Sequence, residues 1–375
     1  MKWSFQIGSA FGIPIRVHVT FLLLLAVLTM GYQGGRFLIY PDWLLLVVLL
    51  FGSVIVHELS HSLMAVRRGI RVHSITLLPI GGVAQMAAMP EDPADEVQIA
   101  VAGPAASYAL AGAIAAVAFL LNHTDGLFQF PSLKDTQIPP GEFLTVIFSR
   151  LFWANVMLGT LNLVPAFPMD GGRVLRGLLA QKVGLVKATH TAVACGQAFA
   201  VLLYCIGALY YHQVGYSFIL LAVFIYIGAR NEEEEVEFRS EIAYVPARDA
   251  MLTRFDSLSP RMTIHESLDV LRHSQQEEFP VLDAGKLAGM VSKNAVLGAL
   301  SEMPREALVG EIMSRDFIHS AADTPLGKVF RQMEERDKDV VPILEDGKLV
   351  GLLSYDQIGR YHSLSAKKRE AESKA

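Results

Sequence analysis

Residues 57–61 read His-Glu-Leu-Ser-His and bring two imidazoles and a carboxylate within little more than one helical turn. Histidines at positions i and i+4 lie on one face of a helix, so His57 and His61 can reach the same tetrahedral zinc ion. The intervening Glu58 can then stand beside the attacking water as a general base. The pattern therefore predicts a hydrolytic zinc site, and such a site needs a third protein ligand.

A candidate for that third ligand lies in the segment from Asn162 to Arg173, which reads NLVPAFPMDGGR. Pro165 and Pro168 cannot continue a helix, and irregular backbone at membrane depth must line a cavity or pack against protein. Asp170 would be an acid held on a rigid turn of this segment. The alternative is that Asp170 caps a helix that begins at Gly171.

The composition indicates what surrounds these residues. The 375 residues are 52% hydrophobic and 18% charged, against about 25% charged in an ordinary soluble protein. Residues 1–230 hold 13 Lys/Arg and 10 Asp/Glu, whereas residues 231–375 hold 19 and 27. This division predicts a membrane part followed by a soluble part. It argues against a disulfide scaffold, a disordered chain and a nucleic-acid-binding protein with a basic face.

The membrane part is expected to be a polytopic α-helical bundle, because a helix needs roughly 20 apolar residues to cross a bilayer core. About six candidate spans are found: Val17–Tyr32, Trp43–Val66, Val97–Leu121, Phe143–Val164, Ala192–Tyr211 and Val214–Ala229. His57 lies in the second span, roughly 21 Å along the helix from Trp43. Ionisable residues at that depth indicate a functional site, the alternative being histidines that merely bridge helices.

Basic residues predict the orientation. They gather in the segments after the second and fourth spans: Arg67, Arg68, Arg71, Arg173, Arg176, Lys182 and Lys187. By the positive-inside rule, both termini and the soluble part should be cytoplasmic, in a multi-pass protein of the plasma (inner) membrane. On the same side, Ser4–His18 and Val72–Met86 have the pattern of small membrane-associated β-hairpins, although they could be simple connections. A free sheet edge there could pair with an extended peptide.

The motif at 57–61 and the N-x-x-P-x-x-P-x-D-G pattern of 162–171 together resemble the site-2 protease family of intramembrane zinc metalloproteases. The resemblance covers essentially residues 1–230. It implies one zinc ion per chain and cleavage within or near the transmembrane segment of a single-pass membrane protein, as in regulated intramembrane proteolysis. The residues it implies are the zinc ligands His57, His61 and Asp170, the general base Glu58, and Asn162 as a contact for the substrate backbone or the oxyanion. Some relatives carry Asn where this chain has Ser107, and no role is assigned to that residue.

The soluble part contains an internal repeat at a constant offset of 62 residues, which pairs Pro280 with Pro342, Gly289 with Gly351 and Ser292 with Ser354. The two units resemble a tandem pair of CBS domains, which are α/β modules that often bind adenine nucleotides in their clefts. Where the family's nucleotide pattern has Asp, the units have Ala295 and Gln357, so ligand binding and a docking or dimerisation role both stay open. The candidate nucleotide contacts are Ser354, Asp356 and Ser292.

These observations predict five parts: a metalloprotease domain at 1–230, an acidic linker or helix end at 231–245, CBS domains at 246–304 and 305–364, and a charged tail at 365–375. The CBS pair would modulate the protease, and it could form a homodimer contact. Two alternatives are a CBS-gated transporter or channel and a metal-dependent scaffold. The first should spread ionisable residues along a pore, and the second should lack Glu58 or a ligand.

Overall fold

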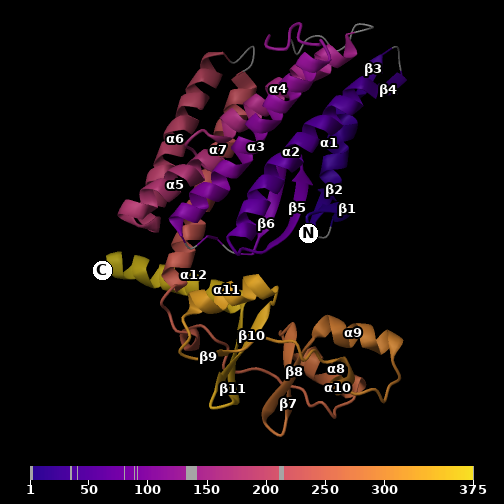
Figure 1. Cartoon of the computed structure of the whole chain (residues 1–375). Helices are drawn as coiled ribbons and strands as arrows, with labels where there is room; N and C mark the ends of the chain where they lie inside the picture. The colour runs from indigo at the N-terminus through magenta and orange to yellow at the C-terminus, as the bar shows by residue number, and fades with distance from the viewer. Residues whose placement is uncertain are drawn as a thin grey trace. The chain divides into compact units, whose positions relative to one another are not determined.

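The computed structural model describes residues 3–33, 36–39, 41–79, 81–87, 89–90, 92–131, 142–210 and 215–374. The chain divides into two compact units, Met1–Val236 and Glu237–Ala375. The first unit is a helical bundle with a four-stranded and a two-stranded sheet, and the second is an α/β unit built from two similar halves (Figure 1).

Among the described residues, seven α-helices begin in the first unit, and the last of them continues into the second. They are α1 (Val19–Thr29), α2 (Pro41–Arg67), α3 (Pro93–Leu120), α4 (Phe143–Asn162), α5 (Asp170–Val183), α6 (Leu185–Leu209) and α7 (Tyr216–Ile242). Helix α3 packs against α2, α4 and α5. It therefore contacts both the helix with the His-Glu-Leu-Ser-His motif and the helix that begins at Asp170.

Within the described residues, four helices are long and apolar enough to cross a membrane, rather than the six spans expected from the sequence. They are Leu44–Arg67, Pro93–Leu120, Phe143–Asn162 and Leu185–Leu209. The first expected span falls short because α1 has 11 residues, about 16 Å of helix against a core of about 30 Å. The chain then enters a two-stranded sheet of β3 (Met30–Gln33) and β4 (Arg36–Ile39). In α7, the apolar stretch gives way to the acidic run of 232–235 without a break in the helix.

The segments expected as hairpins pair into one four-stranded sheet with the order β1-β2-β5-β6. Its strands are β1 (Ser4–Ala10), β2 (Ile13–His18), β5 (Val72–Leu78) and β6 (Gly81–Met86). The outer pairs are antiparallel hairpins, and β2 joins β5 in parallel. Strands β5 and β6 pack against α2, so this sheet lies beside the motif helix (Figure 1).

The second unit repeats one arrangement at the offset of 62 residues. The first half contains α8 (Ile264–His273), β7 (Glu278–Asp283), β8 (Lys286–Ser292) and α9 (Lys293–Glu302), and the second contains α11 (Leu326–Arg336), β10 (Val340–Glu345), β11 (Lys348–Ser354) and α12 (Tyr355–Lys374). Short elements α10 (Val309–Ile312) and β9 (Ser320–Ala321) lie between them. Both hairpins turn through positive φ, at Ala284-Gly285 and at Asp346-Gly347. Each half has its own buried core, one centred on Phe279 and Val281 and the other on Val341 and Ile343.

Candidate metal centre

The two histidines of the motif lie on the same face of α2 and are almost completely buried. The exposed fractions of His57 and His61 are 3% and 4%. Their Nε2 atoms are 3.1 Å apart. The helical spacing of four residues therefore brings both ring nitrogens to one point, as the sequence predicts.

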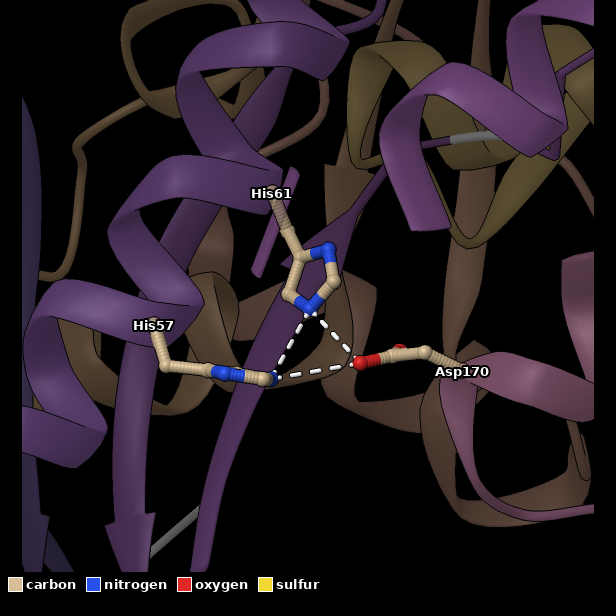
Figure 2. A group of neighbouring side chains, drawn as sticks. All are labelled: His57, His61 and Asp170. Atoms are coloured by element: carbon tan, nitrogen blue, oxygen red, sulfur yellow. Dashed lines mark hydrogen bonds and ion pairs between the residues drawn. The ribbon is translucent and has the colours of Figure 1, made fainter. Parts of the chain in front are cut away.

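Asp170 reaches this point from the opposite side (Figure 2). Its Oδ2 atom lies 3.2 Å from Nε2 of His57 and 3.1 Å from Nε2 of His61. Asp170 is the first residue of α5 rather than a cap before it, because the N-cap position belongs to Met169. The preceding loop is fixed by the buried side chains of Ala166 and Phe167.

Helix α3 orients both imidazole rings from behind. The carbonyl oxygen of Ile99 lies 2.6 Å from Nδ1 of His61, and Oγ of Ser107 lies 2.9 Å from Nδ1 of His57. A carbonyl oxygen can only accept, so Nδ1 of His61 donates to it, and in the neutral ring Nε2 keeps a lone pair. Between these two residues lies Gly103, where a Cβ atom would overlap the ring of His61 and come within 2.7 Å of Nε2 of His57.

The sequence did not predict a role for these three α3 residues, although two of them carry a signal. Gly103 and Ser107 are four residues apart, which places them on one face of a helix. A small or polar stripe of this kind on an apolar helix indicates a close approach by a neighbouring element. The carbonyl of Ile99 gives no such signal, because every residue has one.

The three converging atoms fit a zinc ion. Ligand atoms about 2.0–2.1 Å from a tetrahedral zinc lie about 3.3 Å from one another, close to the 3.1–3.2 Å observed. In the neutral imidazole that binds a metal, Nε2 of His61 carries a lone pair while Nδ1 donates, so lone pairs and a carboxylate oxygen face each other in a buried site. A cation is the group that satisfies such a cluster.

Glu58 lies beside this cluster and against strand β6. A Cβ atom at Gly82 would overlap Cγ of Glu58 and lie 3.2 Å from its carboxyl carbon. The glycine therefore allows the strand backbone to approach the carboxylate closely. Asn162, the other residue expected near the centre, ends α4 half-buried, and its Nδ2 donates to the carbonyl of Leu158 in its own helix at 2.9 Å.

Comparisons with known proteins identify the family. Residues 45–143 and 136–203 match the model of peptidase family M50, and residues 247–302 and 309–361 match the CBS domain. A zinc metalloprotease of Methanocaldococcus jannaschii is 34% identical over 370 residues, which cover 99% of both chains. This chain belongs to peptidase family M50. It is a membrane zinc metalloendopeptidase of the site-2 protease type with a CBS pair.

Two further proteins are similar to this chain. A protein of Synechocystis that carries the zinc metalloprotease name is 27% identical over 94% of each chain. The solved site-2 protease of Methanocaldococcus jannaschii is 35% identical, covers 62% of this chain and 95% of its own, and superposes with a TM-score of 0.43.

The CBS pair of this M50 peptidase contains a cavity of about 650 Å³ that is lined by all three expected nucleotide contacts, Ser292, Ser354 and Asp356. Both serines also support local structure. Oγ of Ser292 accepts from the backbone N–H of Ala295 at the start of α9, and Ser354 hydrogen-bonds the side chain of Gln357. Arg254 and Arg360 add positive charge to the cavity wall.

Proposed function

We propose that this M50 peptidase hydrolyses a peptide bond within or near the transmembrane segment of a membrane-anchored protein. The observation that carries the proposal is the convergence of Nε2 of His57, Nε2 of His61 and Oδ2 of Asp170 within 3.2 Å of one another in a buried site. These three residues would hold the zinc ion. Bound there, zinc would supply Lewis acidity, polarising the scissile carbonyl and lowering the pKa of water.

Glu58 would move the proton. One residue after His57 on α2, its carboxylate can accept a proton from the attacking water and deliver it to the leaving amine. Ser107 and the carbonyl of Ile99 hold the two rings in fixed orientations during this step, and the carbonyl also fixes the proton of His61 on Nδ1. Burial excludes bulk water, which strengthens each of these electrostatic interactions.

Strand β6 would hold the substrate. A transmembrane helix shields its peptide bonds with its own hydrogen bonds, so the substrate must unwind before cleavage. β6 is an outer strand of its sheet, and its Gly82 lies against Glu58. An unwound segment could add to this edge as a further strand, which would bring an extended peptide bond to the carboxylate. Asn162 stays a candidate contact for the substrate backbone or the oxyanion.

Elemental analysis and a cleavage assay together test this proposal. Detergent-purified wild type and Glu58→Gln should each hold about one zinc per chain, and Asp170→Ala should hold much less. In proteoliposomes with a panel of single-span membrane proteins, Glu58→Gln should lose cleavage while it retains zinc. A monodisperse wild type that stays free of zinc after reconstitution would contradict the proposal.

The CBS pair would modulate the peptidase by binding an adenine nucleotide in its cavity. Asp356, Arg254 and Arg360 line this cavity; Asp356 would bind ribose hydroxyls, and Arg254 or Arg360 would bind phosphate. Calorimetry with AMP and ATP on the full chain should show binding that Asp356→Asn weakens. Asp346→Asn, in the β10–β11 turn, is the matched control. Equal binding by both variants would remove Asp356 from the site.

The membrane orientation and the oligomeric state are further parts of the proposal. We propose a plasma (inner) membrane protein with both termini and the CBS pair in the cytoplasm. Fusion of a fluorescent protein or alkaline phosphatase to the C-terminus separates the two orientations, because each reporter is active on one side. A CBS-mediated homodimer would appear as twice the chain mass in light scattering of the detergent-solubilised protein.

A further inference from the structure

A buried arginine lies on α5, the helix that begins with the candidate ligand Asp170. The side chain of Arg176, on α5, is completely buried, and no fully buried side chain among the described residues is larger. By the positive-inside rule, Arg176 was expected to be one of the cytoplasmic basic residues that orient the chain. The structure instead surrounds it with two carboxylates, those of Glu96 and Glu232.

The two carboxylates reach the guanidinium from different helices. Nε of Arg176 donates to Oε1 of Glu96 on α3 at 2.8 Å, and Nη2 donates to the same oxygen. Nη1 donates to Oε1 of Glu232 on α7 at 2.7 Å. Burial would lower the pKa of Arg176, but attraction to Glu96 and Glu232 outweighs it and raises this pKa. The guanidinium therefore stays charged and joins α5 to two other helices.

Arg176 and its partner Glu96 are both connected to the metal centre. Asp170 is the first residue of α5, six positions before Arg176. Cζ of Arg176 lies 4.9 Å from the ring centroid of Phe167, in the loop that leads to Asp170. Glu96 lies one turn before Ile99, whose carbonyl fixes His61. The ion pair thus joins the helix that supplies the carboxylate ligand to the helix that orients the histidines.

Close packing beside Arg176 shows that the two helices meet in one register. A Cβ atom at Gly177 would lie 2.6 Å from Cγ2 of Val97 and 2.8 Å from the carbonyl oxygen of Pro93. Apolar packing alone could hold α5 against α3, and buried ion pairs often contribute little net stability. Their better-attested contribution is to specify one arrangement, because a shifted register would leave charges buried without partners.

The third connection leads out of the membrane unit. Helix α7 carries Glu232 and continues to Ile242, which is 1% exposed in the core of the second CBS half. Glu232 was expected to be part of a solvated linker or helix end, but its side chain is one fifth exposed. Helix α7 therefore carries both Glu232, a partner of Arg176, and Ile242, a core residue of the second unit.

We propose that Arg176 is a positioning residue: its ion pair with Glu96 sets Asp170 against His57 and His61, and its ion pair with Glu232 makes that setting depend on α7. The inference rests on the proposed function, because it requires these three residues to hold zinc. It adds a route by which α7, continuous with the CBS unit, changes the reaction.

The primary test replaces Glu232 with Gln in the full chain. This change leaves Arg176 paired with Glu96, so folding should survive, and thermal unfolding is measured in parallel. Transfer of zinc to a chromophoric chelator should become about tenfold faster, the order typical for loss of a residue that orients a metal ligand. In proteoliposomes kcat should fall while KM stays the same, because Glu232 lies away from the substrate strand. Glu232→Asp, which keeps a carboxylate, should release zinc more slowly than Glu232→Gln and should retain more of the wild-type kcat.

Glu234→Gln is the matched control from the same acidic run. Its carboxylate pairs with Arg230 on the exposed surface of α7, so zinc release and kcat should equal those of wild type. Arg176→Lys is a second variant, since Lys keeps the charge but cannot bond both carboxylates with a planar fork.

The outcomes separate the inference from the proposed function. If wild type holds zinc and cleaves while Glu232→Gln and Arg176→Lys release zinc as slowly as Glu234→Gln, the positioning role is wrong and the protease is unaffected. A lower unfolding temperature with unchanged zinc release would also overturn it, because that result describes a purely structural pair. A wild type without zinc would instead remove the proposed function itself.

Discussion

Gly103 of α3 lies so close to the imidazole of His61 that a Cβ atom there would overlap the ring. The absence of a side chain at this position is what lets α3 pack behind the two histidines. The contact also reaches His57, whose Nε2 would lie 2.7 Å from the same Cβ. One glycine therefore controls the space available to both predicted ligands.

Gly103→Ala should abolish stoichiometric zinc binding, because the rings must move by more than the few tenths of an ångström that a metal site tolerates. Cleavage should be lost with it. Gly112→Ala on the same helix is the control, since a Cβ atom there meets nothing within 4 Å. Elemental analysis of both purified variants checks the expectation, and full zinc content in Gly103→Ala would show that the rings adapt.

Gly82→Ala should lower kcat while the zinc content stays at the wild-type level. The new Cβ would push against Cγ of Glu58, so the carboxylate moves away from its working position although the three ligands are untouched. A displacement of about 1 Å in a catalytic group can cost on the order of a hundredfold in rate. Gly8→Ala in β1, where a Cβ atom has open space, should cleave normally. Loss of zinc from Gly82→Ala would place its effect on the metal ligands instead.

The motif helix and the repeat could be predicted from the sequence because their information is local. The four-residue spacing of His57 and His61 determines that their rings share a face, and the 62-residue offset determines that both CBS halves fold alike. The assignment of Asp170 relied on a family resemblance. No local pattern brings a residue 109 positions beyond His61 to within 3.1 Å of it.

The remaining features depend on tertiary packing. Arg176 carries a charge and follows an apolar span, so the sequence suggests a loop exposed to cytoplasm, but Glu96 and Glu232 make its burial tolerable. The first apolar stretch looks like a span in composition, yet its helix ends at Thr29 and strand β3 follows. The hydropathy of the two segments predicts neither the burial of Arg176 nor the end of α1 at Thr29.

Ser107→Ala should weaken zinc binding by about tenfold or more without removing it. The hydroxyl lies 2.9 Å from Nδ1 of His57, and without it the ring loses the hydrogen bond that fixes its orientation. Competition with a chelator of known affinity measures the change. Ser60→Ala is the control, because that hydroxyl donates to the carbonyl of Val56 one turn earlier in its own helix. Equal zinc affinities for the two variants would contradict an orienting role for Ser107.

Glu278 should make nucleotide binding at the CBS cavity depend on pH. Burial raises the pKa of the Glu278 carboxyl, repulsion from Asp339 raises it further, and Lys338 lowers it. The folded protein therefore holds this proton more tightly than the unfolded chain does. The associated stability is full below the ordinary pKa of 4.5 and is lost as pH rises through the folded value. Above that value, Glu278 and Asp339 are two carboxylates in the wall of the cavity.

Glu278→Gln should consequently bind AMP more tightly than wild type at pH 7.5, by up to roughly fivefold, since a nearby charge contributes on the order of 1 kcal/mol or less at a partly exposed site. The ratio of the AMP affinity of Glu278→Gln to that of wild type should fall towards one as the pH approaches 4.5. The titration of the phosphate affects both proteins equally, so it cancels in this ratio. Calorimetry on the full chain measures it. Glu277→Gln, whose side chain is 74% exposed, should show a smaller ratio that changes less with pH. A ratio for Glu278→Gln that is equal at pH 5 and pH 7.5 would mean that this carboxylate does not face the phosphate.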